Sequence, residues 1–268
     1  MKSLQTRPIG IFDSGVGGLT VVKNVRRHLP EEDILYFGDT ARVPYGNKSR
    51  DTIVRFSLEI MAFMLECRVK MVIVACNTAS SLALPFLRKY YSIPIVGVIT
   101  PGVREAARST KNGRIGVIGT ESTISSKAYD RELRKNKQKG RIFSKGCPLF
   151  VPLVENRFTG SDITYQIVGH YLKSLKQKKI DTLILGCTHY PVLRPVISKV
   201  MGSRVKLIDS SLAVAKEVKE ILVNEKLAAP EKKRKARSQY YVSDDVKGFC
   251  KTANIFLKEK ISAKKVVL

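Results

Sequence analysis

Short continuous runs of apolar residues recur along this chain, and stretches with helical spacing separate them. A run that is apolar throughout, rather than at every second residue, predicts a strand buried on both faces, as in a parallel sheet. Alternating strands and helices therefore predict an α/β fold, with helices on both faces of a mostly parallel sheet. We expect strands at residues 9–12, 34–37, 71–75, 95–99, 115–118, 182–185 and 205–208.

The stretches between these runs mark the helices. Leu19, Val22 and Val25 fall on one side of a helix, and Ser49 is placed to cap the start of another. In sheets of this kind, ligands bind beyond the carboxyl ends of the strands. We therefore expect the residues that carry chemistry just after each strand.

Two pairs of segments repeat one pattern. Residues 9–15 resemble residues 115–123, and residues 75–80 resemble residues 186–191. In the second pair, an apolar strand leads to a small residue, a cysteine and then hydroxyl or amide residues that open a helix. The repeat predicts two similar α/β halves that face each other. The alternative is the loose repetition of any chain of alternating strands and helices.

Net charge and the lengths of the apolar runs indicate which classes of protein this chain can belong to. The 268 residues include 48 Lys and Arg against 23 Asp and Glu, and a net charge of +25 attracts polyanions such as nucleic acid. We interpret the basic runs at 135–145 and 231–237 as solvated loops and helix faces. No apolar run reaches the roughly 20 residues of a membrane span, and the N-terminus lacks the apolar core of a signal peptide. We therefore expect no membrane partner.

The five cysteines are odd in number and widely spaced. They form no CxxC pair and no Cys/His spacing typical of metal sites, so we expect neither a disulfide framework nor a bound metal. Free thiols indicate a reducing cytoplasm as the location. Three of them lack any special context and are assigned to packing: Cys67, Cys147 and Cys250.

The other two cysteines, Cys76 and Cys187, each follow a strand and precede a helix. There the helix dipole and free N–H groups stabilise a thiolate. A modest fall of the thiol pKa from about 8.5 would make either residue a base at neutral pH. The alternative is a small buried residue at each position, but the matched positions favour a functional role.

His189 lies two residues after Cys187, and such a pair suits proton transfer or thiol activation. Its alternative is an ordinary structural histidine. Glu155 stands in an apolar stretch and is expected to be partly buried. It would orient His189, tune a base or pair with a basic neighbour.

Two loops are candidates for ligand binding. The turn at 13–18 brings backbone N–H groups close to an anion, although it does not match a dinucleotide fingerprint, and its alternative is a plain turn. The loop at 38–46 is long and polar for a connection between a strand and a helix. Thr40, Tyr45 and the Gly46 N–H are its candidate contacts, unless Tyr45 simply packs on the surface.

Five segments carry a resemblance to the glutamate racemases of the aspartate/glutamate racemase superfamily. They are DSGVGGLTV, GDTARVPYG, ACNTAS, VPLVE and GCTHYP. The segments follow the family's order and span residues 9 to about 210, which makes the match highly specific. The sequence departs from the family at Asn156, where a second acid is common, and in its high basicity. Neither departure touches the catalytic positions.

The resemblance implies two α/β domains, residues 1–98 plus 209–268 and residues 99–208, with the active site in the cleft between them. It implies that L- and D-glutamate are interconverted without a cofactor, which supplies D-glutamate for peptidoglycan synthesis. By the same match Cys76 removes the α-proton of D-glutamate and Cys187 that of L-glutamate, and two residues assist these thiols, Asp13 and His189. The substrate-binding positions are Asp13, Ser14, Tyr45, Gly46, Asn77, Thr78, Thr188 and His189.

The chemistry agrees with this assignment. Proton removal from one face of the α-carbon and return to the other needs two acid/base groups, one thiolate and one thiol. Helix N-termini at Asn77 and Thr188 and the hydroxyls of Ser14, Thr78 and Thr120 would hold the substrate carboxylates. We add three supporting candidates: Thr40, Thr120 and Glu155.

Two alternative functions stay open. One is a racemase for aspartate or another amino acid on the same scaffold. The other is a basic nucleic-acid-binding protein, which the net charge suggests and the nearly uncharged candidate site disfavours. We also expect a homodimer, whose geometry the sequence does not specify.

Overall fold

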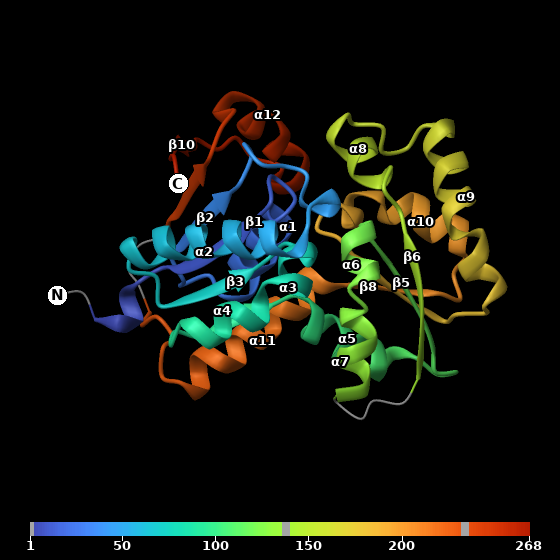
Figure 1. Ribbon diagram of the computed structural model, residues 1–268, viewed down its shortest axis with the longest axis horizontal. Coiled ribbons are helices and arrows are strands. Elements are labelled where there is room, and N and C mark those ends of the chain that lie inside the picture. The colour runs from blue at the N-terminus through green and yellow to red at the C-terminus, as the bar shows by residue number, and fades with distance from the viewer. Residues whose placement is uncertain (1–2, 136–139, 232–235) are drawn as a thin grey trace.

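The computed structural model describes residues 3–135, 140–231 and 236–268, and it contains two separate sheets (Figure 1). Within the described residues every strand pair is parallel. The larger sheet has the spatial order β10 (Lys264–Lys265), β9 (Ser238–Val242), β2 (Ile34–Gly38), β1 (Ile9–Asp13), β3 (Met71–Val74) and β4 (Ile95–Gly97). The smaller has the order β6 (Arg141–Gly146), β5 (Arg114–Gly119), β7 (Thr182–Gly186) and β8 (Lys206–Asp209).

The strand order repeats between the two sheets. It runs β2-β1-β3-β4 in the larger sheet and β6-β5-β7-β8 in the smaller one, so each half lies in the order second, first, third, fourth. This pairs β1 with β5 and β3 with β7. The predicted two similar halves are therefore confirmed, and Cys76 after β3 is the structural equivalent of Cys187 after β7.

Helices cover both faces of each sheet. One face of the larger sheet packs against α1 (Leu19–His28), α11 (Ser210–Asn224) and α12 (Val246–Leu257), and the other against α2 (Arg50–Glu66), α3 (Asn77–Leu82) and α4 (Leu84–Tyr90). One face of the smaller sheet packs against α5 (Ile99–Ser109) and α7 (Ala128–Lys135), and the other against α8 (Phe150–Glu155), α9 (Asp162–Gln177) and α10 (Arg194–Met201). The remaining short elements are α6 (Glu121–Ser125), η1 (Leu4–Thr6), η2 (Tyr45–Asn47) and η3 (Tyr190–Leu193).

Burial on both faces explains the continuous apolar runs. Ile9 and Ile11 of β1 belong to the core beneath α1 and α11, whereas Phe12 belongs to the core beneath α2. The same alternation divides β7, because Ile184 packs on the opposite side from Leu185. The predicted α/β class with helices on both faces is confirmed.

The predicted elements are present with a few differences. All seven expected strands form, but β4 ends at Gly97, and Ile99 already belongs to α5. Ser49 caps α2 as predicted, because its Oγ accepts a hydrogen bond from the Thr52 N–H at 3.3 Å. Three strands were not predicted: β6, β9 and β10.

Strand β6 corrects the interpretation of one basic run. Residues 141–145 form a strand at the edge of the smaller sheet rather than a loop or helix face. An edge strand packs on few neighbours and commonly carries charges, so its sequence lacks a continuous apolar run. The parts of the two basic runs at 136–139 and 232–235 lie outside the described residues.

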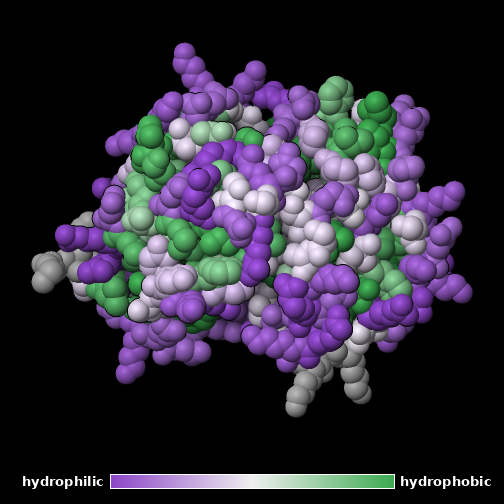
Figure 2. All heavy atoms as spheres, viewed as in Figure 1, coloured by the Kyte–Doolittle hydropathy of each residue, from purple (hydrophilic) through white to green (hydrophobic). Residues whose placement is uncertain are grey.

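The two sheets agree with the predicted division of the chain, whose boundaries stay a prediction. The larger sheet takes strands from residues 9–97 and 238–265, and the smaller one takes strands from residues 114–209. Hydrophilic side chains are spread over the face of the molecule in Figure 2, with small apolar patches between them. In the part of the chain that the structure describes, no helix has the length and apolarity needed to cross a bilayer.

Candidate active site

A cavity of about 40 Å³ lies between the carboxyl ends of the two sheets. Its walls come from loops that follow β1, β2 and β3 on one side and β5, β6 and β7 on the other, as the strand argument predicted. None of the described residues that line it is Lys or Arg. The lining residues are Ser14, Val43, Pro44, Tyr45, Gly46, Cys76, Asn77, Thr78, Thr120, Val151, Glu155, Cys187, Thr188 and His189.

Most of the predicted site residues line this cavity, and two do not. Asp13 is fully buried behind the wall, and Thr40 lies elsewhere on the loop after β2. Both candidate bases, Cys76 and Cys187, are part of the lining. The structure therefore brings most of the predicted residues together at one cavity, and their roles there stay a prediction.

The Cys76 thiol has a pKa that differs in direction from the expectation. Cys76 is the N-cap of α3 and is buried, and burial raises the pKa of its thiol to about 12. The negative charge of Asp13 adds to this rise, while the Ala79 N–H and the Ser14 hydroxyl oppose it. Desolvation thus exceeds the effect of the helix N-terminus, and Cys76 rests as a neutral thiol.

A chain of three side chains surrounds the other thiol. His189 Nδ1 lies 3.8 Å from the Cys187 sulfur, and His189 Nε2 lies 3.1 Å from Glu155 Oε1. Burial lowers the pKa of His189, but its hydrogen bonds to Cys187 and Glu155 together raise that pKa to about 10. His189 is therefore a cation at neutral pH, and this charge lies next to the Cys187 sulfur. Glu155 contacts His189, which fits one of the three roles expected for it, although its side chain is 42% exposed and less buried than expected.

Asp13 lies behind the cavity wall and binds residues of both halves. Its Oδ2 accepts a hydrogen bond from the Gly15 N–H at 3.1 Å, and its Oδ1 accepts one from the Thr188 hydroxyl at 3.3 Å. Burial raises the pKa of the Asp13 carboxyl, and the His189 charge partly offsets that rise. Through Thr188, this carboxylate connects the loop after β1 with the loop after β7.

The glycine-rich turn after β1 approaches protein side chains. A Cβ on Gly17 would lie 2.3 Å from the Thr188 hydroxyl and 2.6 Å from the His189 ring. The absent side chain lets the turn pack against the wall that carries Cys187. The close approach at this glycine is therefore to the other half of the molecule.

Threonine hydroxyls from both halves meet at the cavity. Thr78 Oγ1 lies 3.0 Å from Thr120 Oγ1 and 3.3 Å from Thr123 Oγ1, and the Thr120 hydroxyl donates to Thr123 Oγ1 at 3.0 Å. Sequence reasoning missed Thr123, which is fully buried behind Thr120. The sequence feature that could have identified Thr123 is its place in the repeated segment at 115–123.

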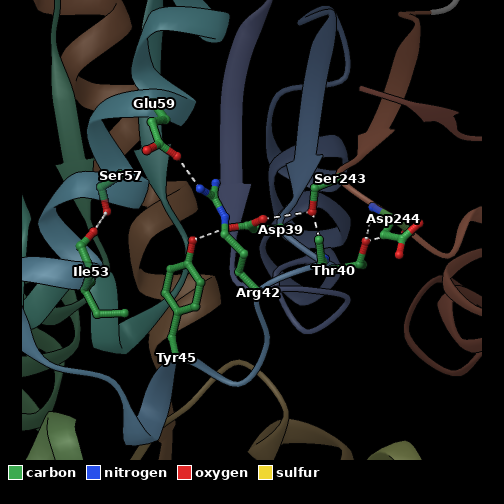
Figure 3. A network of polar contacts seen from close by, with 10 residues as sticks. Asp39, Thr40, Arg42, Tyr45, Ile53, Ser57, Glu59, Ser243 and Asp244 are labelled. Carbon is green, nitrogen blue, oxygen red and sulfur yellow. Dashed lines mark hydrogen bonds and ion pairs between the residues drawn. The ribbon is translucent and has the colours of Figure 1, made fainter. Parts of the chain in front are cut away.

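The loop after β2 is held by a buried carboxylate that sequence reasoning also missed. Figure 3 shows Tyr45 and Arg42 converging on Asp39, with Ser243 on its other side. Arg42 Nε donates to Asp39 Oδ2 at 2.7 Å, and the Ser243 hydroxyl donates to Asp39 Oδ1 at 2.8 Å. The Tyr45 phenol also donates to Asp39, so the hydroxyl of this cavity-lining residue is already engaged.

Of the three residues predicted in this loop, Tyr45 and Gly46 line the cavity and Thr40 does not. Tyr45 is buried, so its alternative as a surface residue is wrong. The Thr40 hydroxyl donates to the Asp244 carbonyl and accepts from the Asp244 N–H at 2.9 Å, away from the cavity (Figure 3). Gly46 lines the cavity, and its carbonyl accepts a hydrogen bond from the Ser122 hydroxyl at 2.6 Å. The tip of the loop is thus tied to the other half.

Comparison with known proteins gives the family. The family model for Asp/Glu/Hydantoin racemase matches residues 18–218. The chain belongs to the Asp/Glu/hydantoin racemase family.

Several members of this racemase family are closely similar over nearly the whole chain. Glutamate racemase of Geobacter metallireducens is 48% identical over 255 residues, which are 95% of this chain and 94% of that protein. The crystal structure of glutamate racemase isoform RacE1 from Bacillus anthracis has a TM-score of 0.94 at 39% identity and covers 98% of both chains. Glutamate racemase from Francisella tularensis in complex with D-glutamate has a TM-score of 0.90 at 39% identity, again covering 98% of both chains.

Proposed function

We propose that this racemase interconverts L- and D-glutamate by proton transfer at the α-carbon, with Cys76 and Cys187 as the two bases. The observation that carries the proposal is the placement of two cysteines after equivalent strands of two facing sheets, on one small cavity. Glutamate rather than aspartate is supported by the names of the three similar proteins compared above, each a glutamate racemase.

The charge states favour a direction for the first step. A His189 cation lies beside the Cys187 sulfur, while the raised pKa of Cys76 keeps that residue a thiol, so we assign the first proton abstraction from L-glutamate to Cys187. The Cys187 thiolate takes the α-proton of L-glutamate, so the C–H bond breaks and an S–H bond forms. The Cys76 thiol gives its proton to the opposite face of the carbanion, which yields D-glutamate and a Cys76 thiolate. The reverse sequence starts from D-glutamate.

Donors around the cavity stabilise the negative charge that develops in this reaction. The Thr78 hydroxyl and the Asn77 amide lie on its walls, whereas the Thr120 and Thr188 hydroxyls already donate to Thr123 and Asp13. Fixed donors in a site with little water are worth more than in bulk solvent. The small volume of the cavity supports such exclusion of water.

The role in the cell follows from the product. We propose that the enzyme supplies D-glutamate for peptidoglycan synthesis in the cytoplasm, which the five free cysteines support. We retain the homodimer as a prediction that sedimentation equilibrium would test. Nucleic-acid binding has no support from the site, and a salt titration of duplex-DNA binding would test it.

The decisive assay follows racemisation of L- and D-glutamate in deuterated water. Both enantiomers should racemise without added cofactor and take up deuterium at the α-carbon. Cys76→Ser and Cys187→Ser should each abolish racemisation, whereas Cys250→Ser, which lies outside the cavity lining, should retain it. Full turnover by either active-site variant contradicts the two-cysteine mechanism, and faster racemisation of L-aspartate than of L-glutamate contradicts the substrate.

A further inference from the structure

Tyr129 reaches the candidate site from behind without lining the cavity. It is the second residue of α7, on the smaller sheet, and only 2% of it is exposed. Its hydroxyl donates a hydrogen bond to Asn77 Oδ1 at 2.6 Å. Asn77 belongs to α3 on the larger sheet and directly follows Cys76. One short hydrogen bond therefore crosses between the halves beside a candidate base.

The same hydroxyl also lies beside the other cysteine. A Cβ on Gly186 would lie 3.1 Å from the Tyr129 hydroxyl oxygen and 3.3 Å from its Cε2 atom. Gly186 is the last residue of β7 and directly precedes Cys187. The tyrosine ring therefore packs on the residue before one cysteine while its hydroxyl binds the residue after the other.

In the structure the Asn77 amide turns its oxygen toward the Tyr129 hydroxyl. An amide has an acceptor oxygen and a donor amino group, and a half-turn exchanges them. Burial raises the pKa of the Tyr129 hydroxyl, so this group keeps its proton and can donate. With Oδ1 on Tyr129, the Nδ2 group is left for the cavity that Asn77 lines. Within the described residues, Nδ2 itself has no hydrogen-bond partner.

We propose that Tyr129 is a positioning residue of the racemase, whose hydroxyl fixes the Asn77 amide so that Nδ2 presents its N–H donors to a carboxylate of the substrate. The proposal rests on the proposed function, because it assigns the ligand of Nδ2 as a glutamate carboxylate. Carboxylates only accept hydrogen bonds, so an amide turned the other way would present an oxygen and repel them.

The direct test removes the hydroxyl and keeps the ring. Tyr129→Phe retains the packing on Gly186 and frees the Asn77 amide to turn. We expect kcat/KM for glutamate to fall about tenfold, since the bond is lost and its buried acceptor is left unpaired. The matched control is Tyr91→Phe, which also removes one hydroxyl, bonded to the Leu58 carbonyl at 3.4 Å outside the site. The control should stay within about twofold of the unaltered enzyme, because exposed or weak bonds contribute little.

A double-mutant cycle with Asn77→Ala separates positioning from a general structural role. If Tyr129 acts through the Asn77 amide, Tyr129→Phe has no further effect once that amide is absent. A structural role would instead give the same loss in both backgrounds. The cycle is measured on kcat/KM and on the dissociation constant of D-glutamate by calorimetry, so it can still be interpreted if Asn77→Ala abolishes turnover.

Each outcome decides the proposal. A loss confined to the background that contains Asn77 supports positioning. A Tyr129→Phe variant that matches the unaltered enzyme, or an equal loss in both backgrounds, overturns it while leaving the racemase function intact. Failure of the unaltered protein to racemise glutamate refutes the proposed function itself, and the ligand assigned to Nδ2 with it.

Discussion

Replacing Glu155 by glutamine should move the alkaline limit of activity to lower pH. Glutamine keeps an oxygen that can accept from His189 Nε2, now 3.1 Å from Glu155 Oε1, but it removes the negative charge. The pKa of His189 is about 10, so its cation, and the support it gives to Cys187, is present below that pH and lost above it. Without the carboxylate the pKa of His189 falls. His189 then loses its proton, and the enzyme its activity, at a lower pH.

The magnitude follows from the hydrogen bond and its exposure. A charge-assisted hydrogen bond exceeds a neutral one by roughly 1–1.5 kcal/mol. Because the Glu155 side chain is 42% exposed, solvent screening reduces this gain to roughly 1 kcal/mol. One pKa unit corresponds to about 1.36 kcal/mol, so the alkaline limb should move down by ~0.7 pH unit.

The assay is a pH profile of kcat/KM between pH 6 and 11 for the unaltered enzyme and for Glu155→Gln. Glu225→Gln is the control, because it removes one exposed acidic charge from the end of α11, outside the cavity lining. The control should keep the alkaline limb of the unaltered enzyme. Superimposable alkaline limbs for all three proteins would refute the role given to Glu155 and His189.

Three further perturbations test the fold and the loops. Lys70→Met leaves Glu32, now 2.5 Å from the Lys70 amine, as an unpaired buried charge, and should lower the free energy of unfolding in urea by about 3–5 kcal/mol. Gly46→Ala would place a Cβ 2.8 Å from Thr120 Cβ, so KM should rise about tenfold with little change in urea midpoint. Asp39→Asn removes the charge that holds the loop after β2; we expect a lower thermal midpoint and a KM raised by about tenfold, measured by calorimetry and steady-state kinetics.

Much of the fold could be predicted because its signals are local. Strands such as β1 and β7 are buried on both faces, so their residues are apolar except for Asp13 at the end of β1 and Thr182 at the start of β7. Edge strand β6 has little of its surface buried, and its sequence therefore looks like a charged loop. The pattern of apolar residues predicts a strand only where that strand is well buried.

The site was predicted in outline for a similar reason. Chain order places Cys76 and Cys187 after strands, and parallel strands bring such positions to one edge. The buried residues Asp39 and Thr123 were missed because their partners lie far away in the chain: Asp39 accepts a hydrogen bond from Ser243, and Thr123 Oγ1 lies 3.3 Å from Thr78 Oγ1. The direction of the Cys76 pKa shift was wrong because the depth of its burial depends on both halves together.

The unequal surroundings of Cys76 and Cys187 cannot make the enzyme favour one enantiomer over the other. L- and D-glutamate are mirror images with equal free energy in water, so their equilibrium constant is one. Detailed balance then requires kcat/KM to be equal for the two directions, however unequal Cys76 and Cys187 are in charge or surroundings. A substitution on one side of the cavity can redistribute kcat and KM between the enantiomers, but it must lower both efficiencies by the same factor. The asymmetry around the two thiols therefore determines which form of the enzyme waits for substrate, and not which enantiomer accumulates.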